Sequence, residues 1–131
     1  MAQGGGRKGR PEGEPSVKVR IYHNPRCSKS RETLRLLRER GIEPEIVAYL
    51  ETPPSPAELR RLLAGLGMGA RDLLRRREPL CRELGLADPD RDEEEVIAAM
   101  CRHPVLIERP IVETEKGVRL GRPPEKVLEI L

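Results

Sequence analysis

The feature of the sequence that most constrains the fold is a helix between two strand-like segments near the N-terminus. Residues 17–22 (VKVRIY) alternate apolar and basic side chains, which is the period of a strand with one buried face. Residues 28–40 carry leucines at helical spacing, and Gly41 follows in the position favoured after a helix. Residues 45–50 (EIVAYL) predict a second strand. Because a helix joins the two strands, they are predicted to be parallel.

The rest of the chain predicts a helical middle followed by two or more strands and a last helix. The predicted elements are a helix opened by a capping box at Ser55–Glu58 and ended by Gly67, short helical pieces at 70–77 and 80–84, a helix from Asp92, strands at 105–107, 111–112 and 118–120, and a helix from Pro124. The resulting order is β-α-β, helices, β-β-α. It is typical of an α/β, thioredoxin-like fold with a helical insertion between its βαβ and ββα halves.

The length of 131 residues fits one domain, which we predict to span residues 17–131. Residues 1–16 are Gly-rich and charged and lack apolar periodicity, so they are predicted to form a flexible tail. This segment also lacks the apolar stretch of a secretory signal. Apolar runs elsewhere are far shorter than the roughly 20 residues that cross a bilayer. We therefore expect a cytoplasmic protein without membrane contact.

Composition also limits the partners. The chain has two tyrosines and no Phe or Trp, so its core must be aliphatic, and it lacks the rows of aromatic side chains on which nucleic-acid bases stack. The net charge of +3 is small, and acidic and basic residues are interleaved. Nucleic acid is therefore not an expected partner. Twenty arginines make any single arginine weak evidence of function.

Cys27 is the strongest candidate for a reactive residue, because it stands where the first predicted strand passes into the first helix. The unpaired N–H groups and partial positive charge of a helix N-terminus lower the pKa of a thiol. The polar and basic neighbours expected to favour the thiolate are His23, Arg26, Ser28, Lys29, Ser30 and Arg31. Cys81 and Cys101 fall in predicted helical segments and are interpreted as structural. The spacing of the three cysteines predicts neither a disulfide framework nor a metal site.

Five segments, taken in order, form a recognisable set. They are residues 21–31 (IYHNPRCSKSR), 49–54 (YLETPP), 73–76 (LLRR), 103–112 (HPVLIERPIV) and 122–125 (RPPE). The set resembles the glutaredoxin-coupled arsenate reductase (ArsC-like) family over almost all of the chain from Val19 onward. The well-known reductases carry small neutral residues after the loop cysteine, whereas this chain has Ser28 and Lys29. Its CSKSRE loop resembles that of a related branch of the family.

The resemblance implies that the protein reduces arsenate to arsenite with a thiol. In the family the loop cysteine, which matches Cys27, attacks arsenate and forms a covalent bond to arsenic. Glutathione then adds to the arsenic as a co-substrate, and glutaredoxin reduces the mixed species. No metal and no bound cofactor are implied.

The resemblance also assigns roles to other side chains. Three arginines hold the oxyanion, and they match Arg75, Arg109 and Arg122. The residue matching His23 helps to keep the cysteine ionised, the residue matching Ser30 supports the thiolate, and Pro110 matches a cis-proline opposite the thiol. Guanidinium groups suit the first task because they form charge-assisted, bidentate hydrogen bonds with oxyanions. His103 is interpreted as a structural residue at a helix end.

Two other functions stay open at this point. Spx-type regulators are related to this family, have the same fold and bind RNA polymerase, but they sense oxidation through a CxxC pair. Ser30 occupies the position of the second cysteine here, so that disulfide cannot form. The other alternative is a monothiol, glutathione-dependent oxidoreductase with a different substrate.

Overall fold

In the computed structural model, which describes residues 18–131, four strands form one mixed sheet in the order β2-β1-β3-β4. The strands are β1 (Arg20–Tyr22), β2 (Glu45–Val47), β3 (Ile111–Thr114) and β4 (Gly117–Leu120). β1 and β2 are parallel, as predicted, and Ile21 lies opposite Ile46. β3 is antiparallel to both β1 and β4. The predicted tail at 1–16 and Val17 lie outside the described residues.

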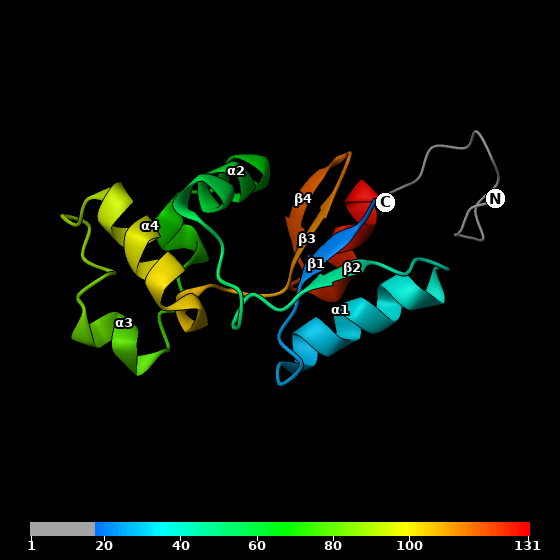
Figure 1. Cartoon of the computed structure of the whole chain (residues 1–131), viewed down its shortest axis with the longest axis horizontal. Coiled ribbons are helices and arrows are strands. Elements are labelled where there is room, and N and C mark those ends of the chain that lie inside the picture. The colour runs from blue at the N-terminus through cyan, green and yellow to red at the C-terminus, as the bar shows by residue number, and fades with distance from the viewer. Residues whose placement is uncertain (1–17) are drawn as a thin grey trace.

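Helices connect and flank these strands. In chain order they are α1 (Ser28–Glu39), α2 (Pro56–Leu66), the 3-10 helix η1 (Ala70–Leu73), α3 (Pro79–Glu83), α4 (Glu93–Arg102), and the 3-10 helices η2 (Pro104–Leu106) and η3 (Pro124–Ile130). α1 joins β1 to β2, and the elements from α2 to η2 form the insertion between the two halves. Figure 1 shows α2, α3 and α4 gathered at one end of the molecule and the sheet with α1 at the other. This is the predicted thioredoxin-like fold with a helical insertion.

The central strands β1 and β3 are buried on both faces, and their alternating side chains contribute to two core clusters. On one face, Ile21 and Val112 pack in a cluster with residues of α1 and η3. On the other face, Tyr22 and Ile111 belong to a larger cluster built from α2, η1 and α4. The insertion is therefore part of the main core, and it covers the sheet face opposite α1.

Local signals explain where the helices of the insertion begin. The Ser55 hydroxyl accepts a hydrogen bond from the Glu58 backbone N–H at 3.1 Å, which is the first half of the predicted capping box. The Glu58 carboxylate accepts a hydrogen bond from the Tyr22 hydroxyl at 2.8 Å instead of closing the box. At α4 both halves of the box are present, between Asp92 and Glu95. Glu58 therefore ties α2 to β1 of the sheet.

The prediction of a strand at 105–107 is wrong. Pro104 begins the 3-10 helix η2 there, since its fixed φ suits a helical first turn. The end of this turn and the chain after it pair with the end of η1 and the chain after that: the Arg75 N–H donates to the Leu106 carbonyl at 2.7 Å, and the Glu108 N–H donates to the Leu73 carbonyl at 2.9 Å. The helical piece predicted at 70–77 accordingly ends at Leu73.

Gly121 permits a close approach between the end of β4, α1 and the chain at Pro110. A Cβ at this position would lie 2.7 Å from Thr33 Oγ1 and 2.9 Å from Pro110 Cγ. We expect Gly121→Ala to lower the free energy of unfolding by about 1–3 kcal/mol, because the well-packed neighbours must move. Urea denaturation measures this. Gly69→Ala is the control, since its Cβ would meet nothing nearer than 3.6 Å; an equal loss in both variants would contradict the expectation.

Candidate active site

Cys27 occupies the N-cap position of α1, at the end of the loop that follows β1. Its backbone is extended (φ −96°, ψ 123°), and its carbonyl accepts the first helical hydrogen bond from Arg31 at 3.0 Å. The Cys27 N–H donates to the Asn24 carbonyl at 3.0 Å, which closes the loop into a tight turn. The side chain is buried, with 8% of its surface exposed. The strand-to-helix position predicted from the sequence is confirmed.

Several opposing effects act on the thiol. Burial raises the pKa of Cys27, since it penalises the charged thiolate. Hydrogen bonding by the Ser30 backbone N–H, hydrogen bonding and positive charge from the Arg109 guanidinium, and hydrogen bonding by the Lys29 backbone N–H lower it. The net result is a thiol pKa below its ordinary value. The sulfur is therefore disposed to react as a thiolate.

The Ser30 side chain organises the loop and does not serve as the sulfur's donor. Its hydroxyl is fully buried, lies 2.6 Å from His23 Nδ1, and accepts a hydrogen bond from the Asn24 N–H at 3.0 Å. Burial lowers the pKa of His23, and the charges of Arg38 and Arg31 act in the same direction, so its neutral ring is favoured. The donor toward the sulfur is the Ser30 backbone N–H, which the fixed loop holds in place.

Arg109 and Arg122 each precede a proline, and the two arginines lie close together. The Arg109–Pro110 bond is cis, as the resemblance implied, and the Arg122–Pro123 bond is also cis. Arg122 Nη1 donates a hydrogen bond to the Arg109 carbonyl at 3.0 Å. Two of the three expected arginines thus lie side by side, and one of them acts on the sulfur.

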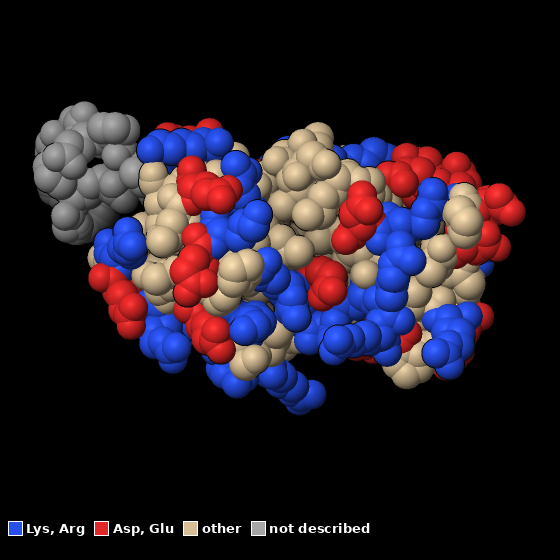
Figure 2. All heavy atoms as spheres, turned by 180° about the vertical axis from the view of Figure 1, so that it is seen from behind, with Lys and Arg blue, Asp and Glu red and all other residues tan. Residues whose placement is uncertain are grey.

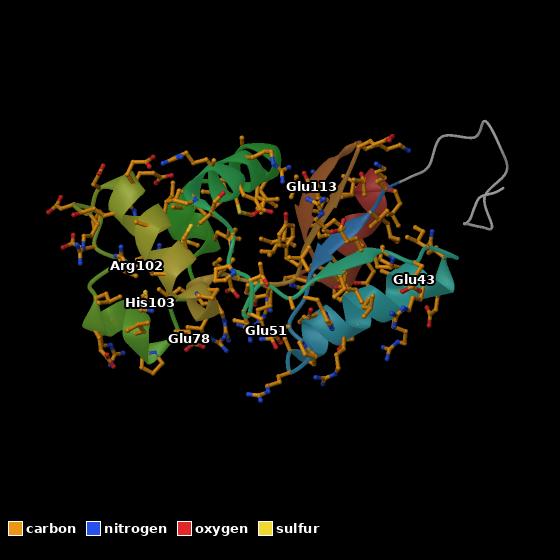
Figure 3. The ribbon with its side chains drawn as sticks, in the orientation of Figure 1. Glu43, Glu51, Glu78, Arg102, His103 and Glu113 are labelled. Carbon is orange, nitrogen blue, oxygen red and sulfur yellow. The ribbon has the colours of Figure 1, made fainter. Side chains whose placement is uncertain are left out.

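Arg75 is already paired with carboxylates. Its Nη1 lies 2.7 Å from Glu78 Oε2, and its Nε lies 3.5 Å from Glu108 Oε1. Figure 3 labels Glu78 on the insertion, at the start of α3. Two acidic partners orient the Arg75 guanidinium and also offset part of its positive charge. The motif points to Arg75, and these two partners become apparent only in the folded chain.

Three buried polar side-chain atoms around this region have no hydrogen-bond partner within residues 18–131. They are Tyr49 Oη, Glu108 Oε1 and Arg109 Nε. Buried polar groups are nearly always hydrogen-bonded, so each such atom requires an explanation. Tyr49 and Glu108 were not among the site residues expected from the sequence. The sequence feature that could have pointed to them is their position inside two of the five segments that resemble the family.

The other cysteines and histidine lie in the helical insertion. Cys81 is buried in the main core cluster, and Cys101 is partly exposed on α4. His103 follows the last residue of α4, where Figure 3 shows it beside Arg102. No disulfide and no group of metal-ligating side chains occur in the part of the chain that the structure describes. None of the helices between residues 18 and 131 combines the length and hydrophobicity that a bilayer crossing requires.

The surface charge is mixed. Figure 2 shows acidic and basic side chains interleaved over the visible face, with Lys and Arg gathered along its lower edge. That edge is where β1 runs into α1 in the orientation of Figure 1. An anion approaching the N-terminus of α1 therefore meets a locally basic surface.

Fold and site together define a thioredoxin-like protein with an activated cysteine at the N-terminus of its first helix. The family model of the ArsC family matches residues 22–130. The chain belongs to the ArsC family. It is 60% identical over 114 residues to the uncharacterized protein YfgD of Escherichia coli K12, covering 86% of this chain and 96% of that protein.

Further relatives carry a functional name. An arsenate reductase of Rhizobium meliloti strain 1021 is 50% identical over 113 residues, which cover 86% of this chain and 81% of that protein. The solved structure of an arsenate reductase from Vibrio cholerae superimposes with a TM-score of 0.86 at 52% identity, covering 89% of this chain and all of that one. These matches extend over the loop, the insertion and the C-terminal strands alike.

Proposed function

We propose that this chain is an arsenate reductase and that Cys27 is its nucleophile. The observation that carries the proposal is the position of Cys27 at the N-terminus of α1, where the Arg109 guanidinium and backbone N–H groups favour the thiolate. Relatives with 50% sequence identity that are named arsenate reductases support the choice of substrate. Glutathione and glutaredoxin, which the family resemblance implies, are the proposed reductants. Their use places the protein in the reducing cytoplasm.

The reaction proceeds through sulfur–arsenic bonds. The Cys27 thiolate attacks arsenic(V), and one arsenate oxygen takes up protons and leaves as water. The glutathione thiol displaces a second oxygen in the same way. A glutaredoxin thiol then attacks the glutathione sulfur, so that the bond between this sulfur and arsenic breaks and its electron pair stays on arsenic. The products of this step are arsenic(III) on Cys27 and a glutathione–glutaredoxin disulfide. Hydrolysis of the remaining bond releases arsenite and restores the thiol.

Arg75, Arg109 and Arg122 are the proposed oxyanion ligands. Arsenate is an anion, and an attacking thiolate brings further negative charge to it. Guanidinium groups offset both charges and stabilise the charge that develops on the departing oxygen. Arg109 serves two purposes in this scheme, because it also lowers the pKa of the attacking thiol. No resident metal or cofactor takes part.

The proposal is tested by mass spectrometry of the protein after incubation with arsenate and glutathione. We expect a mass increase from arsenic and glutathione on a single peptide, the one that contains Cys27. An adduct of glutathione without arsenic would contradict arsenate reduction and favour the monothiol oxidoreductase. An adduct on Cys81 or Cys101 would show that the nucleophile is misassigned.

A further inference from the structure

Tyr49 is buried in a way that packing alone does not explain. It follows β2, and 2% of its surface is exposed. Its ring belongs to the main core cluster and lines a cavity of about 10 Å³ together with Leu59, Ile107 and Glu108. Such a cavity holds at most about one water molecule. The hydroxyl nevertheless has no hydrogen-bond partner anywhere in the described chain.

The charges that act on the pKa of this hydroxyl are those of Arg109, Cys27 and Arg75. The Asn24 side chain lies close enough to lower that pKa without forming a hydrogen bond of ordinary geometry with the hydroxyl. These groups come from three segments that are far apart in the sequence. Arg109 Nε, a second buried donor, is likewise without a partner within residues 18–131. Two buried donors without a hydrogen-bond partner in the described residues therefore belong to the group of side chains that act on one another around Cys27.

We propose that the Tyr49 hydroxyl is a further substrate-binding group, which donates a hydrogen bond to an oxygen of the tetrahedral oxyanion while Arg75 and Arg109 hold the others. This inference rests on the proposed function. It gives the buried hydroxyl a partner that is present only in the complex. The ring, packed in the core, fixes the direction of the O–H bond before the substrate arrives.

Protonation is consistent with this role. Burial raises the pKa of Tyr49 to about 12, against the lowering effect of Arg109. The hydroxyl consequently keeps its proton throughout the range in which the thiol titrates. It supplies a neutral donor beside the two cationic ones, so that it binds the anion without adding positive charge.

The test is Tyr49→Phe, which keeps the ring and removes the hydroxyl. We expect kcat/KM for arsenate to fall about 10- to 100-fold, the usual effect of losing a hydrogen bond to a charged group. The urea midpoint should stay the same or rise, because the variant no longer buries an unpaired hydroxyl. If the hydroxyl had a purely structural role, Tyr49→Phe would instead lower the urea midpoint and leave kcat/KM for arsenate unchanged.

Tyr22→Phe is the matched control. The Tyr22 hydroxyl donates to the Glu58 carboxylate at 2.8 Å, so its removal should lower the urea midpoint and leave kcat/KM for arsenate unchanged. An unchanged kcat/KM for arsenate in Tyr49→Phe would overturn the proposal. So would an equal decrease of kcat/KM in Tyr49→Phe and in Tyr22→Phe.

A second readout separates this inference from the proposed function. Inorganic arsenate should protect Cys27 from alkylation by iodoacetamide, and Tyr49→Phe should need about 10-fold or more arsenate for the same protection. If arsenate protects the wild type at lower concentration than Tyr49→Phe but the wild type does not reduce it, the proposed function fails and the Tyr49 assignment is supported. Equal protection of both proteins, or protection of neither, overturns the assignment.

Discussion

Cys27→Ser is expected to abolish arsenate-dependent NADPH consumption in an assay coupled through glutathione and glutaredoxin. The loss should be on the order of 10³-fold or more, because a serine hydroxyl at this position is not ionised and cannot form the sulfur–arsenic bond. The fold should persist, since Cys27 occupies the N-cap position of α1 without a side-chain capping hydrogen bond and the substitution changes one atom. Circular dichroism and the urea midpoint verify this.

The two remaining cysteines provide the controls. Cys101→Ser changes a partly exposed residue, and Cys81→Ala avoids a hydroxyl in the main core cluster. Both variants should keep most of the activity, with Cys81→Ala losing some stability through the smaller side chain. Retention of activity in Cys27→Ser would show that another residue is the nucleophile.

Arg109→Ala should change two measurable quantities at once. The Arg109 guanidinium lowers the pKa of Cys27, so its removal should raise that pKa and shift the pH profile of iodoacetamide alkylation to higher pH. The fraction of thiolate at neutral pH falls accordingly. The same variant loses a ligand for the oxyanion, so the KM for arsenate should rise about 10-fold or more.

Arg122→Ala separates the two effects. The Arg122 guanidinium donates to the Arg109 carbonyl and is not among the largest causes of the lowered thiol pKa. This variant should raise the KM for arsenate and leave the alkylation profile in place. Arg82→Ala, at an exposed position on α3, should change neither quantity. If Arg109→Ala keeps the wild-type alkylation profile, Arg109 does not act on the sulfur.

The sequence predicted the reactive residue because its signals are local. An alternating strand, a break and a leucine-spaced helix place Cys27 at a helix N-terminus whatever the rest of the chain does. The motifs likewise selected Arg109 and Pro110, and the cis bond between them is present. The strand at 105–107 was predicted wrongly because an apolar run has no period that distinguishes a strand from a 3-10 turn after proline.

The partners of the site residues could not be predicted in the same way. Arg75 meets Glu108 only because the segments after η1 and η2 pair with each other across the insertion. The motif assigned Ser30 to the support of the thiolate, but it did not show that the Ser30 hydroxyl lies against His23 while the Ser30 backbone N–H acts on the sulfur. A side chain's direction depends on what surrounds it, and short-range patterns carry no information about that.

The sequence by itself determined the order of elements outside 105–107, the parallel β1–β2 pair and the position of Cys27, since each follows from residue spacing over one or two turns or strands. The tertiary structure alone decided that Arg109 acts on the sulfur, that carboxylates form ion pairs with Arg75, and that the Tyr49 hydroxyl is buried without a partner in the described residues. These facts arise where segments distant in the chain meet. Packing of the sheet against the insertion brings them together, and packing depends on the whole fold.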